Sequence, residues 1–380
     1  MMSTILELQQ FTANLHFQET NQFVYTPTQL GAHIQQIVPD TDIEALDIIL
    51  VGCGECRGQK LNAQYSDGPD KIREALYKLH YWHPDVKIGD LGNIMEGASL
   101  ADTRAALKTV LADLKSMGKK VIVLGGSHDL TLQQYDVFKE AGEIIDFTII
   151  DMLADVAEGN GTNYDDYLLT ALTSTPNFVR HFNLIGFQSY YVNPNLIETL
   201  DKLRFDCIRV GKAREDIEQI EPVLRGTHLL SLDMNAVRYS DAPANKMASP
   251  NGFYGDEMCK ITRFAGMSPT LFSFGIYGYH PSQDTEDITA RLIAQMLWYY
   301  IDGVSVGKTE VELNDKDQFL EYHITFTDNN SLFLKSKRTN RWWMKLPDGR
   351  FIACTHKDYL TACNNEIPER WLREMERIVG

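Results

Sequence analysis

The sequence contains few cysteines, no long apolar run and no excess of positive charge. Its 380 residues include six cysteines, which are scattered along the chain. Such a sparse set predicts reduced thiols instead of a disulfide framework. The 36 Lys and Arg residues against 52 Asp and Glu residues leave a net charge of −16. Because this charge repels phosphate backbones and anionic lipids, we expect neither nucleic acid nor a membrane surface as a partner.

Membrane spans and secretory signals are also missing from the sequence. Its apolar runs are shorter than the roughly 18 residues that a membrane helix needs. Residues 1–17 lack the basic region, apolar core and cleavage site of a signal peptide. The sequence therefore predicts a cytoplasmic protein. With 44% apolar residues, the chain can bury a large core.

Short apolar runs rich in Ile, Val and Leu recur along most of the chain. They occupy residues 45–52, 119–126, 145–151, 181–187, 206–211, 227–233 and 269–276. Because these runs are continuous and do not alternate with polar residues, they indicate strands buried on both faces. Helical patterns at 67–81 and 99–120 lie between some of them; Ser99 and Asp102 are placed to cap the second, and Gly118 to end it. The predicted fold is α/β, with a three-layer architecture around a parallel sheet.

The pattern changes near residue 304. A core helix is predicted over 287–303, and the alternation of strand and helix stops after it. We therefore predict an N-terminal extension, an α/β domain and a small C-terminal α+β module. Their boundaries are 1–44, 45–303 and 304–380.

Within this module the sequence predicts antiparallel strands and a closing helix. The strand segments are 309–313, 321–328, 331–337 and 341–354, with a hairpin turn at 347–349. The closing helix is predicted over 366–379. Five apolar residues share one of its faces: Ile367, Trp371, Leu372, Met375 and Ile378.

Residues that bind metals follow three of the predicted strands. His128 follows the second apolar run, Asp151 and Asp155 follow the third, and Asp233 ends the sixth. One polar residue at a strand end is an ordinary cap or loop residue, but three such strand ends in one parallel sheet favour a ligand site. One imidazole and three carboxylates suit Mn²⁺ or Mg²⁺ better than zinc.

The motifs that carry these residues resemble those of a known enzyme family. They are "GCGECRGQKLNAQYSDGPDKIREAL", "GGSHD", "DMLAD", "SLDMNAVRYSDAP" and "PNGFYGDEMCKITRFAGMS". In this order and spacing, residues 45–303 resemble the ureohydrolase family of arginase, agmatinase and formimidoylglutamase. The resemblance implies an arginase-like fold and a site for two Mn²⁺ ions.

The resemblance also implies that this binuclear site is incomplete. The side chains that would hold the first ion are His128, Asp151, Asp155 and Asp233. The second ion needs a histidine where this chain has Leu153 and an aspartate where it has Asn235. Leucine cannot bind a metal, and the neutral amide removes a negative charge. The chain is therefore expected to be a divergent member that holds one Mn²⁺.

Further departures lie on the substrate side. In the family's later Glu-x-Asn-Pro motif, Gly278 and His280 stand in place of the Glu and the Asn, while Pro281 and Asp284 remain. The loop 156–168 contains no histidine, although arginase-type members use one there. We interpret His280 as structural and not as a replacement ligand.

Two hypotheses for function follow. The first is a ureohydrolase-fold protein with a degraded two-manganese site, a pseudoenzyme with a non-hydrolytic role in binding, regulation or assembly. The alternative is an active formimidoylglutamase-like C–N hydrolase that acts on linear amidines with one metal or altered ligands. The expected partners are a small molecule in the strand-end cleft and a protein at the C-terminal module, and the resemblance implies a homo-oligomer.

Two other motifs have alternative interpretations. Cys53 and Cys56 have the spacing of a redox or zinc half-site, but we expect a structural role because no second cysteine pair is suitably placed. Trp342 and Trp343 face opposite ways on a strand, so one of them could anchor a partner. The interpretation we favour packs one under the closing helix and the other against the large domain.

Overall fold

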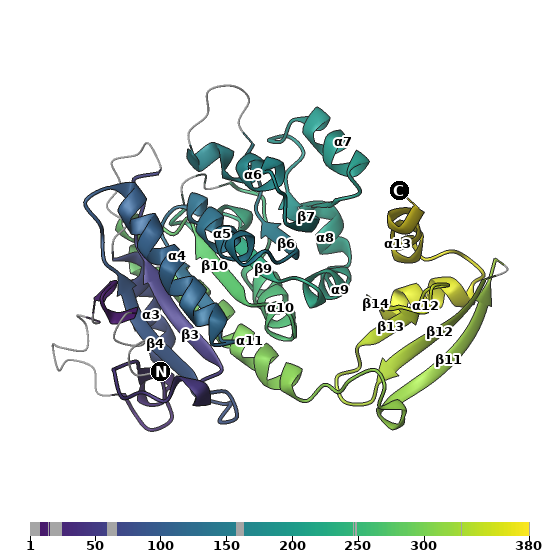
Figure 1. Ribbon diagram of the computed structural model, residues 1–380, viewed down its shortest axis with the longest axis horizontal. Coiled ribbons are helices and arrows are strands. Elements are labelled where there is room, and N and C mark those ends of the chain that lie inside the picture. Colours follow the sequence, from purple (N-terminus) through teal and green to yellow (C-terminus); the bar gives the residue numbers. More distant parts are fainter. Residues whose placement is uncertain are drawn as a thin grey trace.

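The computed structural model describes residues 8–13, 15, 25–58, 67–156, 163–245, 247, 249–327 and 329–379. Over these residues the chain forms a large α/β domain with a smaller four-stranded module beside it (Figure 1). Helix α11 (Ile288–Lys308) leads from the domain to the module. No described helix has both the length and the apolar character needed to cross a membrane.

The domain is built on one ten-stranded sheet. Its strands are β1 (Thr12–Ala13), β2 (Gln35–Gln36), β3 (Ile48–Cys53), β4 (Ile88–Ile94), β5 (Lys120–Gly125), β6 (Ile145–Ile150), β7 (Val179–Phe187), β8 (Asp206–Arg209), β9 (Leu229–Asp233) and β10 (Ser273–Tyr277). The main order is β1-β4-β3-β5-β10-β9-β6-β7-β8, and β2 pairs with β4. All pairings are parallel except that of β1 with β4. The seven apolar runs of the sequence each supply one of these strands.

Strand β4 was not predicted, because its sequence is interrupted by polar residues and glycines. Asp90 lies in the middle of the strand and is buried. Its carboxylate accepts hydrogen bonds from Arg73 Nε at 2.7 Å and from the Tyr77 hydroxyl at 2.6 Å, both from α3 (Gly68–Tyr77). The groups that stabilise the buried Asp90 carboxylate belong to another element, α3. The sequence pattern of β4 alone therefore does not indicate that the strand is buried.

Helices cover both faces of the sheet, which confirms the three-layer prediction. On one face lie α3, α8 (Val210–Glu215), α9 (Ile220–Arg225), α10 (Gly255–Gly266) and α11. On the other lie α4 (Leu100–Ser116), α5 (Thr131–Ala141), α6 (Asn163–Thr173) and α7 (Pro194–Lys202). Ser99 and Asp102 form the predicted capping box of α4, and Gly118 follows its end at a φ of +69°.

Helix α11 does not end at Gly303 as predicted, but continues to Lys308. A Cβ at Gly303 would lie 2.1 Å from the carbonyl oxygen of Arg263 in α10. The glycine therefore permits close contact between two helices instead of ending one of them. The predicted boundary between domain and module falls inside this helix.

The module contains a second sheet and two helices. The antiparallel strands are β11 (Phe319–Phe326), β12 (Asn329–Ser336), β13 (Trp342–Lys345) and β14 (Phe351–Cys354), in that order. The helices are α12 (His356–Cys363) and α13 (Glu369–Val379). The sequence predicts this sheet, its 347–349 turn and α13, but α12 was missed.

Two details of the module prediction are wrong. Residues 309–313 form no strand; the Glu310 carboxylate instead accepts hydrogen bonds from the Ser336 and Arg341 side chains. The apolar face of α13 is narrower than predicted, because Trp371 is buried while Leu372 is 45% exposed. The side chain of Ile378 lies outside the described residues.

Both adjacent tryptophans are buried, so the interpretation of one as an exposed partner anchor is wrong. Trp342 stacks against Tyr359 of α12 in the module core, with ring centroids 5.0 Å apart. Trp343 faces the domain, where the Arg225 guanidinium of α9 lies 4.4 Å from its ring centroid. The module is thus packed onto the amino-terminal side of the large sheet.

Candidate metal centre

The predicted ligands converge at the carboxyl ends of three strands. His128 begins the short 3-10 helix between β5 and α5, Asp151 follows β6, and Asp233 is the last residue of β9. Strand β9 pairs with β6 on one side and β10 on the other, and β10 pairs with β5. The topology therefore brings segments from distant parts of the sequence to one edge of the sheet.

One imidazole nitrogen lies within reach of all three carboxylates. His128 Nδ1 is 3.1 Å from Asp151 Oδ2, 3.0 Å from Asp155 Oδ2 and 3.4 Å from Asp233 Oδ2. The side chains of His128, Asp151 and Asp233 are at most 1% exposed, and that of Asp155 is 9% exposed. All four residues predicted from the sequence thus belong to one buried cluster.

Hydrogen bonds from neighbouring side chains orient the histidine. Its Nε2 lies 2.8 Å from Ser231 Oγ, which is 2.6 Å from Thr131 Oγ1. Ser231 Oγ can accept the Nε2 proton, so Nδ1, which faces the carboxylates, is the nitrogen that would bind a cation. Outer hydrogen bonds of this kind fix the tautomer of metal-binding histidines.

Each of the two buried aspartates uses one oxygen in a local turn. Asp151 Oδ1 accepts a hydrogen bond from the Leu153 amide at 3.0 Å, and Asp233 Oδ1 accepts one from the Asn235 amide at 2.7 Å. Their Oδ2 atoms are the ones that approach His128. Within the described part of the chain, the buried Asp233 Oδ2 has no hydrogen-bond partner.

Burial and mutual repulsion shift the ionisation of this cluster. Burial raises the pKa of Asp151 and of Asp233, and the charge of a neighbouring carboxylate raises each further. Burial lowers the pKa of His128, but hydrogen bonds to Asp151 and Asp155 outweigh it and the pKa lies well above its usual value. Two buried carboxylates and a partly buried one thus face a single imidazole, an arrangement that a cation would stabilise.

The donor set fits one divalent cation. One ligand atom from each of His128, Asp151 and Asp233 lies within 4.8 Å of the others. Ligands around an octahedral Mn²⁺ or Mg²⁺ ion, at about 2.1 Å from it, are separated by roughly 3 to 4 Å. Three carboxylates and one imidazole also match the chemical preference of these ions.

The position expected for a second ion is less suitable. Leu153 supplies a hydrocarbon side chain and Asn235 a neutral amide, whose Oδ1 already accepts a hydrogen bond from the Met247 amide at 3.2 Å. At Gly278, where φ is +75°, a Cβ would lie 2.4 Å from Asp233 Oδ1. A side chain at this position, where the family motif carries a glutamate, would therefore meet Asp233.

Comparison with known proteins agrees with this fold. The model of the arginase family matches residues 46–302. This chain belongs to the arginase family. Formimidoylglutamase from Hahella chejuensis is 24% identical over 297 residues, which cover 71% of this chain and 89% of that protein. Formimidoylglutamase from Klebsiella pneumoniae is 34% identical over 277 residues, covering 66% and 84%.

Solved structures share the fold of this arginase-family protein. Formimidoylglutamase from Bacillus subtilis aligns with a TM-score of 0.67 and 17% identity, over 75% of this chain and 95% of that one. Formiminoglutamase from Trypanosoma cruzi, crystallised with Mn²⁺, aligns with a TM-score of 0.64 and 15% identity, over 73% and 98%. At these identities the likeness establishes the fold.

One residue of this arginase-family site was not predicted. The Tyr167 hydroxyl, from α6, lies 3.1 Å from Nδ1 and 3.2 Å from Nε2 of His128. Burial and the charge of Asp155 raise the pKa of Tyr167 well above its ordinary value, so it keeps its proton. In the sequence this tyrosine is only one more apolar position of a helix, and no local motif distinguishes it.

The other sequence motifs have structural roles where they are described. Cys53 is buried in β3, and burial raises its pKa to about 12, which disfavours a reactive thiolate. His280 is buried, and its amide donates to the Ala244 carbonyl. Asp284 accepts hydrogen bonds from the first amides of α11. Residues 157–162 of the loop expected to lack a proton shuttle lie outside the described residues.

Proposed function

We propose that this protein binds one divalent cation, preferably Mn²⁺, and hydrolyses a C–N bond of a linear amidine of the formimidoylglutamate type. The observation that carries the proposal is the convergence of three carboxylates on His128 Nδ1 at the carboxyl ends of β5, β6 and β9. The curated relatives named formimidoylglutamase and the Mn²⁺-containing structural neighbour support the substrate class and the metal.

The cluster's residues have separable tasks in such a reaction. His128, Asp151, Asp155 and Asp233 would hold the cation, which lowers the pKa of a water molecule and so supplies a nucleophile near neutral pH. Ser231 orients the imidazole through Nε2. The Tyr167 hydroxyl holds the ring from α6 and stays protonated. Burial of the cluster keeps bulk water away from the reacting carbon.

A second candidate function is non-hydrolytic binding or regulation. It is favoured by Leu153 and by the Asn235 amide oxygen, which is already hydrogen-bonded to Met247. Hydrolysis by two ions benefits from a nucleophile shared between them, and a single ion activates water less strongly. The same fold would then present its strand-end cleft to a small molecule without turnover.

Metal analysis combined with substrate assays separates the two candidates. Purified protein is loaded with Mn²⁺, its metal content per chain is measured, and formimidoylglutamate, arginine, agmatine and guanidino acids are assayed. The hydrolase proposal expects about one ion per chain and turnover of formimidoylglutamate. Turnover should disappear in Asp151→Ala and persist in the control Asp317→Ala, which changes an exposed carboxylate of the module.

Each remaining outcome has a definite meaning. One bound ion without turnover of any of these compounds would reject the hydrolase proposal and favour the non-hydrolytic role. Turnover that survives Asp151→Ala would show that a different site does the chemistry. A protein that takes up no Mn²⁺ would contradict the assignment of the metal centre itself.

A further inference from the structure

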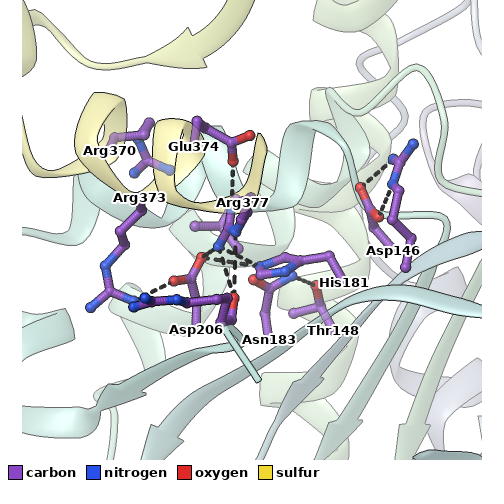
Figure 2. Close-up of polar contacts among 12 residues, drawn as sticks. Asp146, Thr148, His181, Asn183, Asp206, Arg370, Arg373, Glu374 and Arg377 are labelled. Atoms are coloured by element: carbon purple, nitrogen blue, oxygen red, sulfur yellow. Dashed lines mark hydrogen bonds and ion pairs between the residues drawn. The ribbon is translucent and has the colours of Figure 1, made fainter. Parts of the chain in front are cut away.

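The C-terminal helix closes over the edge of the sheet opposite the metal centre. Figure 2 shows Arg373 and Arg377 of α13 reaching from the helix to Asp206 on the sheet below it. Asp206, the first residue of β8, accepts hydrogen bonds from Arg373 Nη1 at 2.7 Å and from Arg377 Nη2 at 2.9 Å. Arg377 Nη2 also lies 3.0 Å from His181 Nε2 of β7. Because the arginase-family match ends at residue 302, α13 lies outside it.

Two cavities lie where the module and the domain meet. Their volumes are about 430 Å³ and about 390 Å³, and their walls share Asp206, Arg370 and Arg377. Volumes of this size are typical of sites for small molecules. Arg370 Nε, which has no hydrogen-bond partner, lines both cavities, but only the smaller one also reaches Asn183 of β7, whose Oδ1 is likewise unsatisfied among the described residues.

Most charged groups in the wall of the smaller cavity neutralise one another. Asp146 receives two hydrogen bonds from Arg180, at 2.8 and 2.7 Å. Arg225 is paired with Glu221, with Nε 3.0 Å from Oε1. These pairs leave little net charge for a ligand to balance.

Two polar atoms in this wall are left without partners among the described residues. Asn183 is 2% exposed, and its Nδ2 donates to Thr148 Oγ1 at 3.0 Å while its Oδ1 has no partner. Arg370 Nε is buried and also has no hydrogen-bond partner. The rest of the guanidinium is partnered: Nη2 donates to the Gln219 carbonyl at 3.2 Å, and the group forms an ion pair with Asp358, whose Oδ2 lies 3.8 Å from Nε. A buried donor and a buried acceptor without partners are costly unless something else satisfies them.

The remainder of the smaller cavity's wall is partly apolar. Val223 and Pro222 contribute from α9, and Phe351, Ile352 and Ala353 from β14. A ligand that satisfies this wall needs a hydrogen-bond acceptor for Arg370 Nε, a hydrogen-bond donor for Asn183 Oδ1 and an apolar part. We propose that the cavity binds a small amino acid or hydroxy acid with an apolar side chain. Its carboxylate pairs with Arg370, and its amino or hydroxyl group donates to Asn183 Oδ1.

This site is separate from the metal centre. Asp146 and Asp151 lie at opposite ends of β6, five residues apart, which corresponds to roughly 17 Å along a strand. Binding at the cavity requires neither a metal nor turnover. The inference therefore stands whether or not the proposed hydrolase activity is found.

Calorimetric titration of the full-length protein tests the inference with matched probes. L-leucine, L-2-hydroxy-4-methylpentanoate and 4-methylpentanoate differ only in carrying an amino group, a hydroxyl group or neither. The first two probes distinguish an amino acid site from a hydroxy acid site, and at least one should bind. The third should bind at least about 10-fold more weakly, because Asn183 Oδ1 then stays unpaired. Equal binding of all three, or no binding by any, would overturn the proposal.

A matched pair of arginine substitutions locates the site. Arg370→Gln should weaken binding by about 10-fold or more, since it removes a charged hydrogen bond. Arg350→Gln, in the exposed hairpin pair with Asp348, should leave binding unchanged. Hydrogen exchange of the unaltered protein with L-leucine and with the hydroxy acid gives an independent measurement. Protection should appear in β7 and α13, whereas protection confined to the carboxyl ends of β5, β6 and β9 would contradict the assignment.

Discussion

At the carboxyl ends of β5, β6 and β9, three carboxylates surround a single imidazole. At the amino ends of β6 to β8, by contrast, each carboxylate faces arginines, as Asp206 faces Arg373 and Arg377. Both clusters are held by the same sheet, but only the first concentrates charge of one sign. The carboxyl edge would be balanced by the proposed cation, while the amino edge is balanced by the chain's own module.

The two clusters also differ in how far along the chain their charged residues lie from the strands that they contact. The carboxyl-edge ligands sit in short motifs that directly follow strands, so their positions can be inferred from strand order. The amino-edge arginines lie on an amphipathic helix more than 160 residues after Asp206, since Arg373 follows it by 167 positions. A charged helix face of this kind is ordinarily solvated, and the sequence alone did not predict its docking.

The sharpest test of this contrast is removal of one charge from the carboxyl edge. Asp233→Asn keeps the shape of the side chain but removes an anionic ligand. It should lower Mn²⁺ affinity by at least about 100-fold, more than the loss of an outer hydrogen bond typically costs. Affinity is measured by equilibrium dialysis with metal analysis, with Asp317→Asn as control. Unchanged affinity would mean that the cation, if any, lies elsewhere.

The ligands expected for a second Mn²⁺ ion can be introduced at the carboxyl edge by substitution. Leu153→His combined with Asn235→Asp restores an imidazole and a carboxylate beside Asp151 and Asp233. The stoichiometry should rise from about one Mn²⁺ per chain toward two, because both lost donors return. Metal content per chain is the measurement. If it stays at one, then the alignment of these strand ends with the family motifs is wrong.

At the amino edge, loss of one carboxylate charge should affect stability instead of metal binding. Asp206→Asn should destabilise the protein by about 2 to 3 kcal/mol, because charged hydrogen bonds to Arg373 and Arg377 are lost from a largely buried site. Urea unfolding followed by a probe in α13 measures the effect. A change within 0.5 kcal/mol, taken as about the usual surface effect, would show that α13 is held by other contacts.

The contribution of Asp206 to the stability of the folded protein depends on pH. Burial raises the pKa of Asp206, but the hydrogen bond to His181 and the charge of Arg377 outweigh it, so the pKa is lowered overall. Because the pKa of Asp206 is lower in the folded state than its value of about 3.9 in the unfolded chain, its ionised form stabilises the protein fully above that pH. This stabilisation is lost progressively as the pH falls from there through the folded-state pKa. Asp206→Asn should remove that part of the acid sensitivity. An identical acid profile in variant and parent would contradict the linkage.

The smallest predicted effect concerns the helix that joins the domain to the module. Gly303→Ala should cost about 1 to 3 kcal/mol, because its Cβ would press on the Arg263 carbonyl of α10. Gly211→Ala in α8 is the matched control, since nothing lies within 4 Å of its Cβ and alanine favours the helix. Thermal unfolding compares the two. If Gly303→Ala and Gly211→Ala melt at the same temperature, then α10 and α11 accommodate the added methyl group without a loss of stability.

The sequence predicts the elements whose own residues determine them. Continuous apolar runs identified β3, β5 and β6, and the Ser99 and Asp102 cap identified the start of α4. Elements whose stability comes from distant partners were missed. Strand β4 depends on Arg73 to neutralise Asp90, and the site residue Tyr167 is defined only by its contact with His128. The sequence therefore predicted four residues that the structure brings together, but not the residues that surround them.

The close contact between Gly278 and Asp233 restricts how this chain could regain the glutamate of the family's Glu-x-Asn-Pro motif. Any side chain at 278 would collide with Asp233 Oδ1 at 2.4 Å, and the φ of +75° there disfavours every residue except glycine. Replacing Gly278 alone would thus displace a carboxylate that the remaining cluster uses. A side chain at 278 would therefore have to be accompanied by a shift of Asp233, which makes this departure from the family motif hard to reverse by one substitution.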